Sequence, residues 1–288
     1  MRAIAWESLW GRRWLGRLVS LLLIFAIVNL AINNVFGLIM GDSLDGIAAQ
    51  MREARDVQGV IAVLSDGAHA RTLAFAAVFN LLFSFLYTGL YSYSMAAATL
   101  KAVDGAYDMK GVFHSFRIPI GVWWQAVLTC LVTYWPLIAY YAFLWGLDEF
   151  AGLRVSLSGA GCGSMMVGVL CLVRFYRFRM AWFVKAENED YGAAKCLVES
   201  ARITHGAKLR NLAFDCSYWA TFLVVAALAL LFLFAAGASG DGARFFGILV
   251  SGFAIIAAGV FAKLYMNVGQ AVFYRELEVE KNEKKEFE

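Results

Sequence analysis

Charged residues, histidine and proline are all scarce in this chain of 288 residues. Asp, Glu, Lys and Arg together make up 16% of it, against about 25% in soluble domains. The three histidines are scattered, and no HExxH, GxSxG or Walker A pattern occurs. The usual sequence signals of zinc proteases, α/β hydrolases and phosphate-binding loops are therefore missing. We predict that the protein is not an enzyme and has no catalytic residue, no metal site and no cofactor.

A disulfide framework is equally unsupported. The five cysteines form an odd number, none belongs to a CxxC pair, and all lie in or beside apolar segments. A cysteine in such a place behaves as a small apolar side chain.

The acidic cluster Glu187, Glu189 and Asp190 has no histidine or cysteine beside it. We expect this cluster to end one helix and cap the next rather than bind a metal.

Long apolar runs are the main feature that is present. Hydrophobic residues make up 61% of the chain, and the mean hydropathy is +0.65. Six runs reach the roughly 20 residues that a helix needs to cross a bilayer. We predict an all-α polytopic membrane protein, with one membrane domain over residues 1–274 and a charged tail over residues 275–288. The six predicted transmembrane helices are about residues 15–40, 72–100, 118–145, 159–184, 209–236 and 243–274.

Lys and Arg residues are distributed unevenly between the connections of these spans. The side that carries both termini holds 19 of the 25 Lys and Arg residues, the other side holds five, and Lys263 lies within the last span. Basic residues concentrate on the cytoplasmic side of membrane proteins. Both termini are therefore predicted to be cytoplasmic. Membrane insertion alone accounts for this asymmetry, and no nucleic-acid partner is expected.

The connection between the fourth and fifth spans is predicted to form an amphipathic elbow helix over residues 191–205, lying in the cytoplasmic interface. Asp190 is its expected N-cap, and Gly206 is its expected C′ residue. Similar segments before the first and third spans predict three such elbows. The charged face comprises Lys195, Glu199 and Arg202, and the apolar face comprises Ala194, Leu197, Val198 and Ala201.

Three local features concern helix packing. The outer connection over residues 41–71 is predicted to carry a short amphipathic surface helix, with a mobile loop as the alternative. Pro136 should kink the third span, and Thr133 or water should meet the carbonyl that the proline frees. Small residues open the fourth span and allow close helix contact, either inside one subunit or at the face of a homo-oligomer. These small residues are Gly159, Gly163, Ser164 and Gly168.

Ionisable and amide side chains within the spans are the candidate functional residues, because such residues are rare in membranes and usually face the protein interior or water. By the predicted topology they fall in the cytoplasmic half of the membrane. Two interpretations stay open. In one, Asp215 pairs with a cation and locks helices together. In the other, the cluster forms a cytoplasm-facing cavity that binds an anionic group such as a lipid phosphate. The candidates are Arg174, Arg177, Asp215, Lys263, Asn267 and Gln270.

The connection between the fourth and fifth spans also resembles a known family. The matching residues are 179–188, 192–193, 199–202, 206, 208, 212, 214–215 and 217, with residues 265–266 and 271–277 near the end. They are similar to an uncharacterised family of bacterial integral membrane proteins, domain of unknown function 975. This resemblance implies six helices and an inner-membrane location, but no known reaction or substrate. The family often has proline at the positions of Glu189 and Leu264. A more distant resemblance, to the membrane domain of some glycerophosphodiester phosphodiesterases, favours lipid-related work.

Two functions fit these observations. The first is a non-enzymatic membrane protein that binds a lipid or small amphiphile, or assists its transport, through the polar cavity. The second is a membrane scaffold or accessory subunit that docks a membrane or cytoplasmic partner through the elbow and the charged tail. Removing the residues after Glu276 should abolish docking of such a partner and leave the cavity largely unaffected.

Overall fold

The computed structural model describes residues 14–54, 59, 62–63, 66–105, 119–151, 157–237 and 241–286. Apart from short turns these residues are helical, and they form no strand, which confirms the predicted all-α class. The helices are α2 (Trp14–Glu53), α4 (Gly67–Asp104), α5 (Pro119–Ala151), α6 (Leu157–Phe178), α7 (Ala181–Glu187), α8 (Ala193–Ile203), α9 (Lys208–Gly237) and α10 (Asp241–Glu286).

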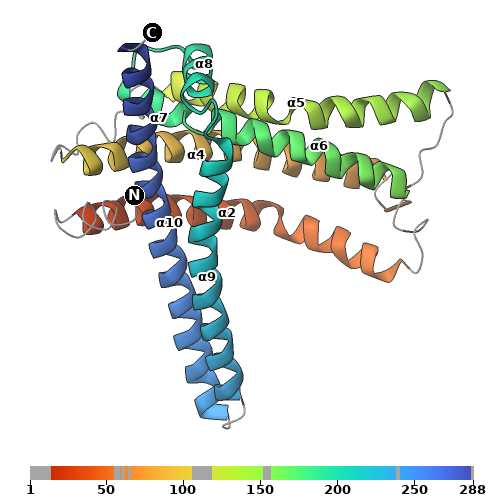
Figure 1. The fold of residues 1–288 in the computed structure, drawn as a ribbon. Helices are drawn as coiled ribbons and strands as arrows, with labels where there is room; N and C mark the ends of the chain where they lie inside the picture. Colours follow the sequence, from red (N-terminus) through yellow and green to blue (C-terminus); the bar gives the residue numbers. More distant parts are fainter. Residues whose placement is uncertain are drawn as a thin grey trace.

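Four of the long helices, α2, α4, α5 and α6, run along one direction and alternate in polarity (Figure 1). The first residues of α2 and α5 and the last residues of α4 and α6 therefore lie near α7 and α8. The α9–α10 hairpin crosses these four helices, and the C-terminal part of α10 lies beside α7 and α8 (Figure 1). We call α7, α8 and residues 271–286 of α10 the polar end of the molecule.

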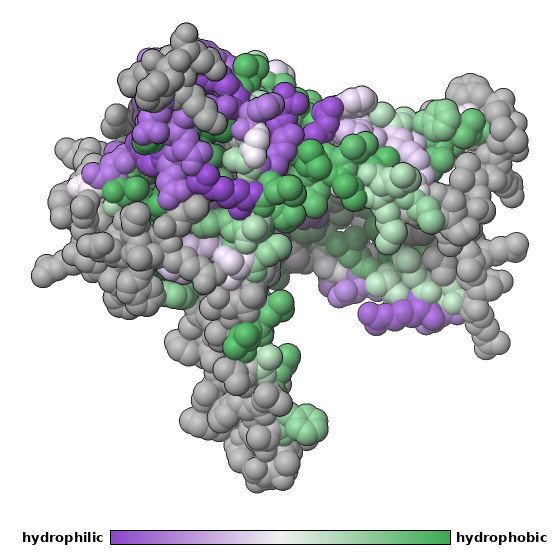
Figure 2. Space-filling view, in the orientation of Figure 1, coloured by the Kyte–Doolittle hydropathy of each residue, from purple (hydrophilic) through white to green (hydrophobic). Residues whose placement is uncertain are grey.

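Within the described part of the chain, three helices are long and apolar enough to cross a membrane, over Leu15–Glu53, Gly67–Asp104 and Ile120–Leu144. Large apolar side chains on them, such as Ile27 and Leu38, are strongly exposed. Figure 2 shows hydrophobic residues along α5 and α6 and hydrophilic residues gathered at the polar end. Such extensive apolar surface is typical of a protein that lies in lipid. Three of the six predicted spans are supported in this way, and the other three stay predictions.

α2 does not end where the first predicted span ends. It continues to Glu53, so the separate surface helix predicted within residues 41–71 is wrong for residues 41–53. The chain re-enters a helix after Asp66, whose carboxylate accepts a hydrogen bond from the backbone N–H of Ala68 at 3.0 Å. A side-chain acceptor at this position satisfies an otherwise unpaired N–H group of the first turn. Asp66 therefore fixes the start of α4.

The fourth predicted span, residues 159–184, is wrong as a single helix. α6 ends at Phe178, a turn over Arg179 and Met180 follows, and α7 begins at Ala181. Arg179 therefore lies in the turn and not within α6. This break decides which of the nearby arginines reaches the interior of the molecule.

α8 closes the open C-terminal end of α6. The hydroxyl groups of Ser200 and Thr204 both donate hydrogen bonds to the backbone carbonyl of Arg177, at 3.1 and 2.8 Å. The last carbonyls of a helix have no partner within the helix. The two hydroxyl groups replace the missing N–H donors, and they also anchor α8 to α6.

The predicted elbow helix exists as α8, but Asp190 is not its cap. Gly192 occupies the N-cap position. On the predicted charged face, Arg202 pairs with Glu199 and Lys195 is exposed. The predicted apolar face is only partly correct, because Val198 is 68% exposed. The buried face comprises Ala193, Cys196, Leu197, Ser200 and Ile203. The other two predicted elbows lie outside the described residues.

The small residues of α6 differ in what surrounds them. Gly163 lies directly against the ring of Tyr140 in α5, and the hydroxyl groups of Ser164 and Tyr141 are 3.0 Å apart. These residues pack inside the subunit. Gly168 faces open space. A homo-oligomer contact on this helix therefore stays a prediction that concerns Gly168.

α10 packs closely against α9. Phe273 of α10 is fully buried and stacks on Phe214 of α9 with the ring centroids 5.9 Å apart. Gly269 permits this close approach. A β-carbon there would lie 2.6 Å from the ring of Phe214 and 2.5 Å from the hydroxyl oxygen of Tyr218.

We expect the substitution Gly269→Ala to lower thermal stability, because inserting a group into a packed core costs about 1–3 kcal/mol. Gly168→Ala is the matched control, since alanine meets no atom there and favours an exposed helix by about 1 kcal/mol. Tryptophan fluorescence during heating measures both, and the chain has nine tryptophans to report it. Equal melting temperatures for the two variants would contradict the close approach at Gly269.

Candidate functional site

A cavity of about 750 Å³ lies between α4, α5, the α6–α7 turn and α10. Apolar side chains such as Leu81, Phe85 and Trp182 form much of its wall. This volume falls within the range of about 300–1,000 Å³ that is usual for sites of small organic ligands. Each surrounding element also contributes polar side chains to the wall, and these decide what the cavity can bind.

Arg179 is the cation that α6 and α7 contribute to the wall. It pairs with Asp215 of α9, and both side chains are 10% exposed. The hydroxyl of Tyr176 donates a second hydrogen bond to the same carboxylate at 3.0 Å. Asp215 is not among the residues that line the cavity. The carboxylate therefore stands behind Arg179 and holds the guanidinium at the cavity wall.

Lys263, Asn267 and Gln270 follow one another at helical spacing on α10, and all three line the cavity. The structure thus brings together three of the predicted site residues. Lys263 forms no ion pair with any described residue, and its charged neighbours are Arg179 and Asp215. Two cations and one carboxylate leave this part of the site with net positive charge. An anionic group is the complementary ligand.

Arg174 and Arg177 do not pair with Asp215, so that part of the predicted cluster is wrong. Arg177 is exposed, and neither side chain lines the cavity. Arg174 instead donates a hydrogen bond to the backbone carbonyl of Val132 at 3.0 Å. Pro136 lacks the N–H group that would normally bond to this carbonyl four residues earlier. Arg174 therefore donates to the carbonyl that the proline frees, a role predicted for Thr133 or water.

We expect Arg174→Ala to destabilise the protein by about 1–3 kcal/mol, because a partly buried carbonyl loses a charged donor. In a Pro136→Ala background the same substitution should cost clearly less, since the alanine introduced there supplies its own N–H to the carbonyl of Val132. Melting temperatures of the four proteins form a double-mutant cycle. Additive effects of the two substitutions would show that Arg174 acts independently of Pro136.

A row of polar residues on α4 was missed from the sequence. Asn80, Ser84, Thr88 and Ser92 recur every four residues in the mainly apolar middle of α4. All four line the cavity. Residues four apart share one face of a helix. The spacing of these four residues therefore indicates a polar face on α4, although none of them is charged. We call these four residues the α4 row.

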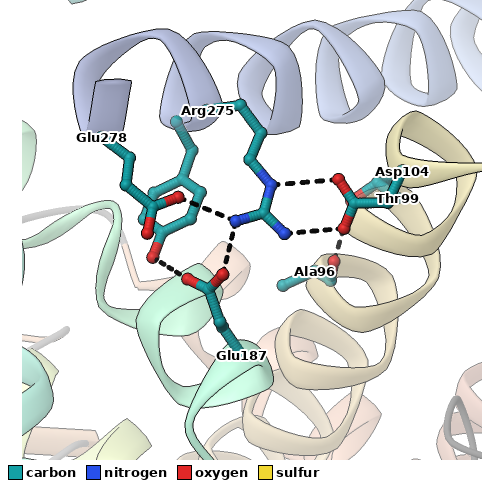
Figure 3. Close-up of polar contacts among 7 residues, drawn as sticks. Ala96, Thr99, Asp104, Glu187, Arg275 and Glu278 are labelled. Carbon is teal, nitrogen blue, oxygen red and sulfur yellow. Dashed lines mark hydrogen bonds and ion pairs between the residues drawn. The ribbon is translucent and has the colours of Figure 1, made fainter. Parts of the chain in front are cut away.

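Arg275 organises the polar end beside the cavity (Figure 3). It donates two hydrogen bonds to Asp104 of α4, at 3.0 and 2.6 Å, and one to Glu278 at 2.8 Å. It also pairs with Glu187 of α7, which accepts a hydrogen bond from Tyr274 at 2.6 Å. One guanidinium thus joins the C-terminal ends of α4 and α7 to α10.

The environment of Arg275 keeps it charged. Burial by itself lowers the pKa of Arg275, but the hydrogen bonds with Asp104, Glu187 and Glu278 outweigh this effect and raise it. The predicted charged tail, residues 275–288, begins inside α10. Leu277 is 2% exposed, and α10 continues to Glu286. The tail begins as part of the packed structure.

The described residues contain no group of three or more His, Cys, Asp or Glu side chains placed to hold a metal ion. The site therefore consists of a cavity with two cations, amides and hydroxyl groups.

No protein-family model, curated protein sequence or solved structure matches the chain. Its function has to be argued from this geometry.

Proposed function

We propose that the chain is a non-enzymatic, multi-pass protein of the cell membrane that binds an amphiphile with an anionic headgroup. In this proposal six helices cross the inner (plasma) membrane and both termini are cytoplasmic. The single observation that supports it best is the placement of Lys263 and Arg179 on the wall of one cavity. Only one of these two cations is neutralised by an ion pair with a described carboxylate.

The proposed division of roles follows from the chemistry of the wall. The headgroup binds Lys263 and the N–H groups of Arg179 that Asp215 and Asn211 leave available, while Asn267 and Gln270 donate hydrogen bonds. The amide nitrogen of Gln270 has no partner among the described residues, although the side chain is buried. A buried donor without a partner is costly, and a bound anion would supply one. The apolar part of the wall accommodates the hydrocarbon.

Native mass spectrometry of protein released from nanodiscs tests this proposal. The nanodiscs contain equal amounts of phosphatidylglycerol and phosphatidylethanolamine. We expect the wild type to retain phosphatidylglycerol, and Lys263→Met to reduce retention about tenfold, because a hydrogen bond to a charged group contributes about 1.5–3 kcal/mol. Lys263 has no ion pair with a described residue, so its loss should leave folding intact.

Arg177→Gln is the matched control for that experiment. Arg177 lies in the last turn of α6, close in sequence to Arg179, but its side chain is exposed and outside the cavity. Equal loss of phosphatidylglycerol in the two variants would indicate binding to basic surface residues. Failure of the wild type to retain any anionic lipid would refute the proposed function.

The alternative of a scaffold that docks partners through its tail has less support. Glu276 and Glu280 of the tail already bind Arg210 of α9, at 2.9 and 2.7 Å. Removing the residues after Glu276 would break one of these contacts within the subunit. Loss of a partner after this truncation would therefore not by itself identify a docking surface. The exposed charged face of α8 is the better candidate for such a role.

A further inference from the structure

The α4 row extends the polar wall of the cavity along α4. Asn80 and Ser92 mark its ends, about 18 Å apart at 1.5 Å per residue. This is more than half of a hydrocarbon core of about 30 Å. The row lies in the middle of α4, a helix long and apolar enough to cross the membrane. The polar wall therefore continues across the central part of a candidate span.

The opposite wall repeats this chemistry. Thr129 and Thr133 of α5 line the same cavity, one helical turn apart. The hydroxyl of Thr129 and the amide nitrogen of Gln270 are buried without a hydrogen-bond partner among the described residues. Gln270 is only 7% exposed. Unpaired polar groups of this kind are uncommon in folded proteins, and here both belong to residues of the cavity wall.

The main barrier to moving a lipid between leaflets is the loss of hydration of its headgroup in the hydrocarbon core. A wall that offers a hydroxyl or amide at each helical turn replaces those water contacts step by step. The apolar acyl chains need no such path, because they stay in lipid. The cavity thus has features that headgroup passage requires: two cations and a long polar row on its wall.

We propose that the α4 row is a track along which the anionic headgroup moves between the two leaflets. This inference rests on the proposed function, because the headgroup enters at Lys263 and Arg179. It goes further in assigning a movement to the bound lipid. The movement involves no covalent step and no energy source. The lipid can therefore cross in either direction, and its net movement follows its concentration gradient.

Purified protein in phosphatidylcholine vesicles, with phosphatidylglycerol labelled on an acyl chain with a nitrobenzoxadiazole dye, tests the proposal. Dithionite added outside bleaches only the outer leaflet unless lipids exchange. We expect wild-type vesicles to be bleached completely. Bleaching of dye that starts in the inner leaflet forms a second phase, which requires lipid exchange. The triple variant Asn80→Leu, Ser84→Ala and Thr88→Val should slow this second phase about tenfold or more, because a modest rise in the barrier has an effect of this size.

The chain offers a control with the same three changes outside the cavity. Ser20, Asn33 and Thr72 each donate a hydrogen bond to a backbone carbonyl of their own helix, and none lines the cavity. Asn80 makes the same kind of bond, to the carbonyl of Ala76. The variant Ser20→Ala, Asn33→Leu and Thr72→Val should exchange lipid at the wild-type rate. If the triple α4 variant does not fold, Thr88→Val alone replaces it.

The outcomes separate the inference from the proposed function. Wild-type protein that retains phosphatidylglycerol in the nanodisc experiment but does not exchange it between leaflets overturns the track and leaves binding intact. Equal slowing by the two triple variants also overturns it. A dye trapped in water inside the vesicles should stay unbleached. If that dye is bleached as well, the cavity is an aqueous pore and the inference is wrong.

Discussion

Asp215→Ala is expected to destabilise the protein by about 3–5 kcal/mol, the usual cost of leaving one member of a buried ion pair without its partner. Arg179 and Asp215 are both 10% exposed, so water cannot replace the lost carboxylate easily. The hydroxyl of Tyr176 loses its acceptor in the same variant. The measurement is the melting temperature in a fixed detergent, with a decrease on the order of 10 °C.

The double variant Arg179→Met and Asp215→Leu distinguishes a structural lock from a ligand site. Apolar residues of similar volume often replace a buried ion pair without loss of stability. We therefore expect the double variant to recover most of the melting temperature and still to retain much less phosphatidylglycerol. Full recovery of both properties would show that the pair only connects α9 to the α6–α7 turn. Recovery of neither would show that the packing around Arg179 requires the charges.

Arg275→Gln is expected to cost about 2 kcal/mol or more, because several charge-assisted hydrogen bonds are lost at once. Asp104, Glu187 and Glu278 would then face one another without a cation (Figure 3). Arg275→Lys should recover only part of the loss, since an ammonium group cannot form the paired contact with Asp104. The melting temperature measures both variants.

Arg202→Gln is the control for Arg275. Arg202 also forms an ion pair, with Glu199, but its side chain is 48% exposed. Exposed pairs of this kind contribute about 0–1 kcal/mol. Hydrogen exchange adds a local test, because the C-terminal end of α7 should lose protection in Arg275→Gln and keep it in Arg202→Gln. Unchanged exchange at α7 would show that Arg275 does not hold this helix.

The α10 side of the site was predictable because its signal is local. Lys263, Asn267 and Gln270 are polar residues in an apolar run, and their spacing of four and three residues places them on one helix face. The structure confirms that they line one cavity. The α4 row carries the same kind of local signal. It was missed because serine and threonine are common in membrane helices and attract less notice than charges.

Arg179 could not be chosen over Arg174 and Arg177 by the same means. All three lie within a run of six residues that alternates cations and aromatic rings. Their roles depend on where α6 stops, and it stops where Ser200 and Thr204 supply donors to its last turn. Those donors come from a helix more than 20 residues later in the chain. A partner at that distance leaves no trace in the local hydropathy pattern.

The sequence by itself determined the all-α class, the position of the main apolar helices and the polar face of α10. These properties depend on hydrophobic runs and helical periodicity, which a single segment expresses. Only the tertiary structure decided that Arg179 pairs with Asp215 and that Arg174 donates a hydrogen bond to the carbonyl freed by Pro136. It also decided that Arg275 joins the ends of α4 and α7 to α10. Each of these contacts links residues far apart in the chain, and its free energy exists only once helix breaks and crossings have brought the partners together.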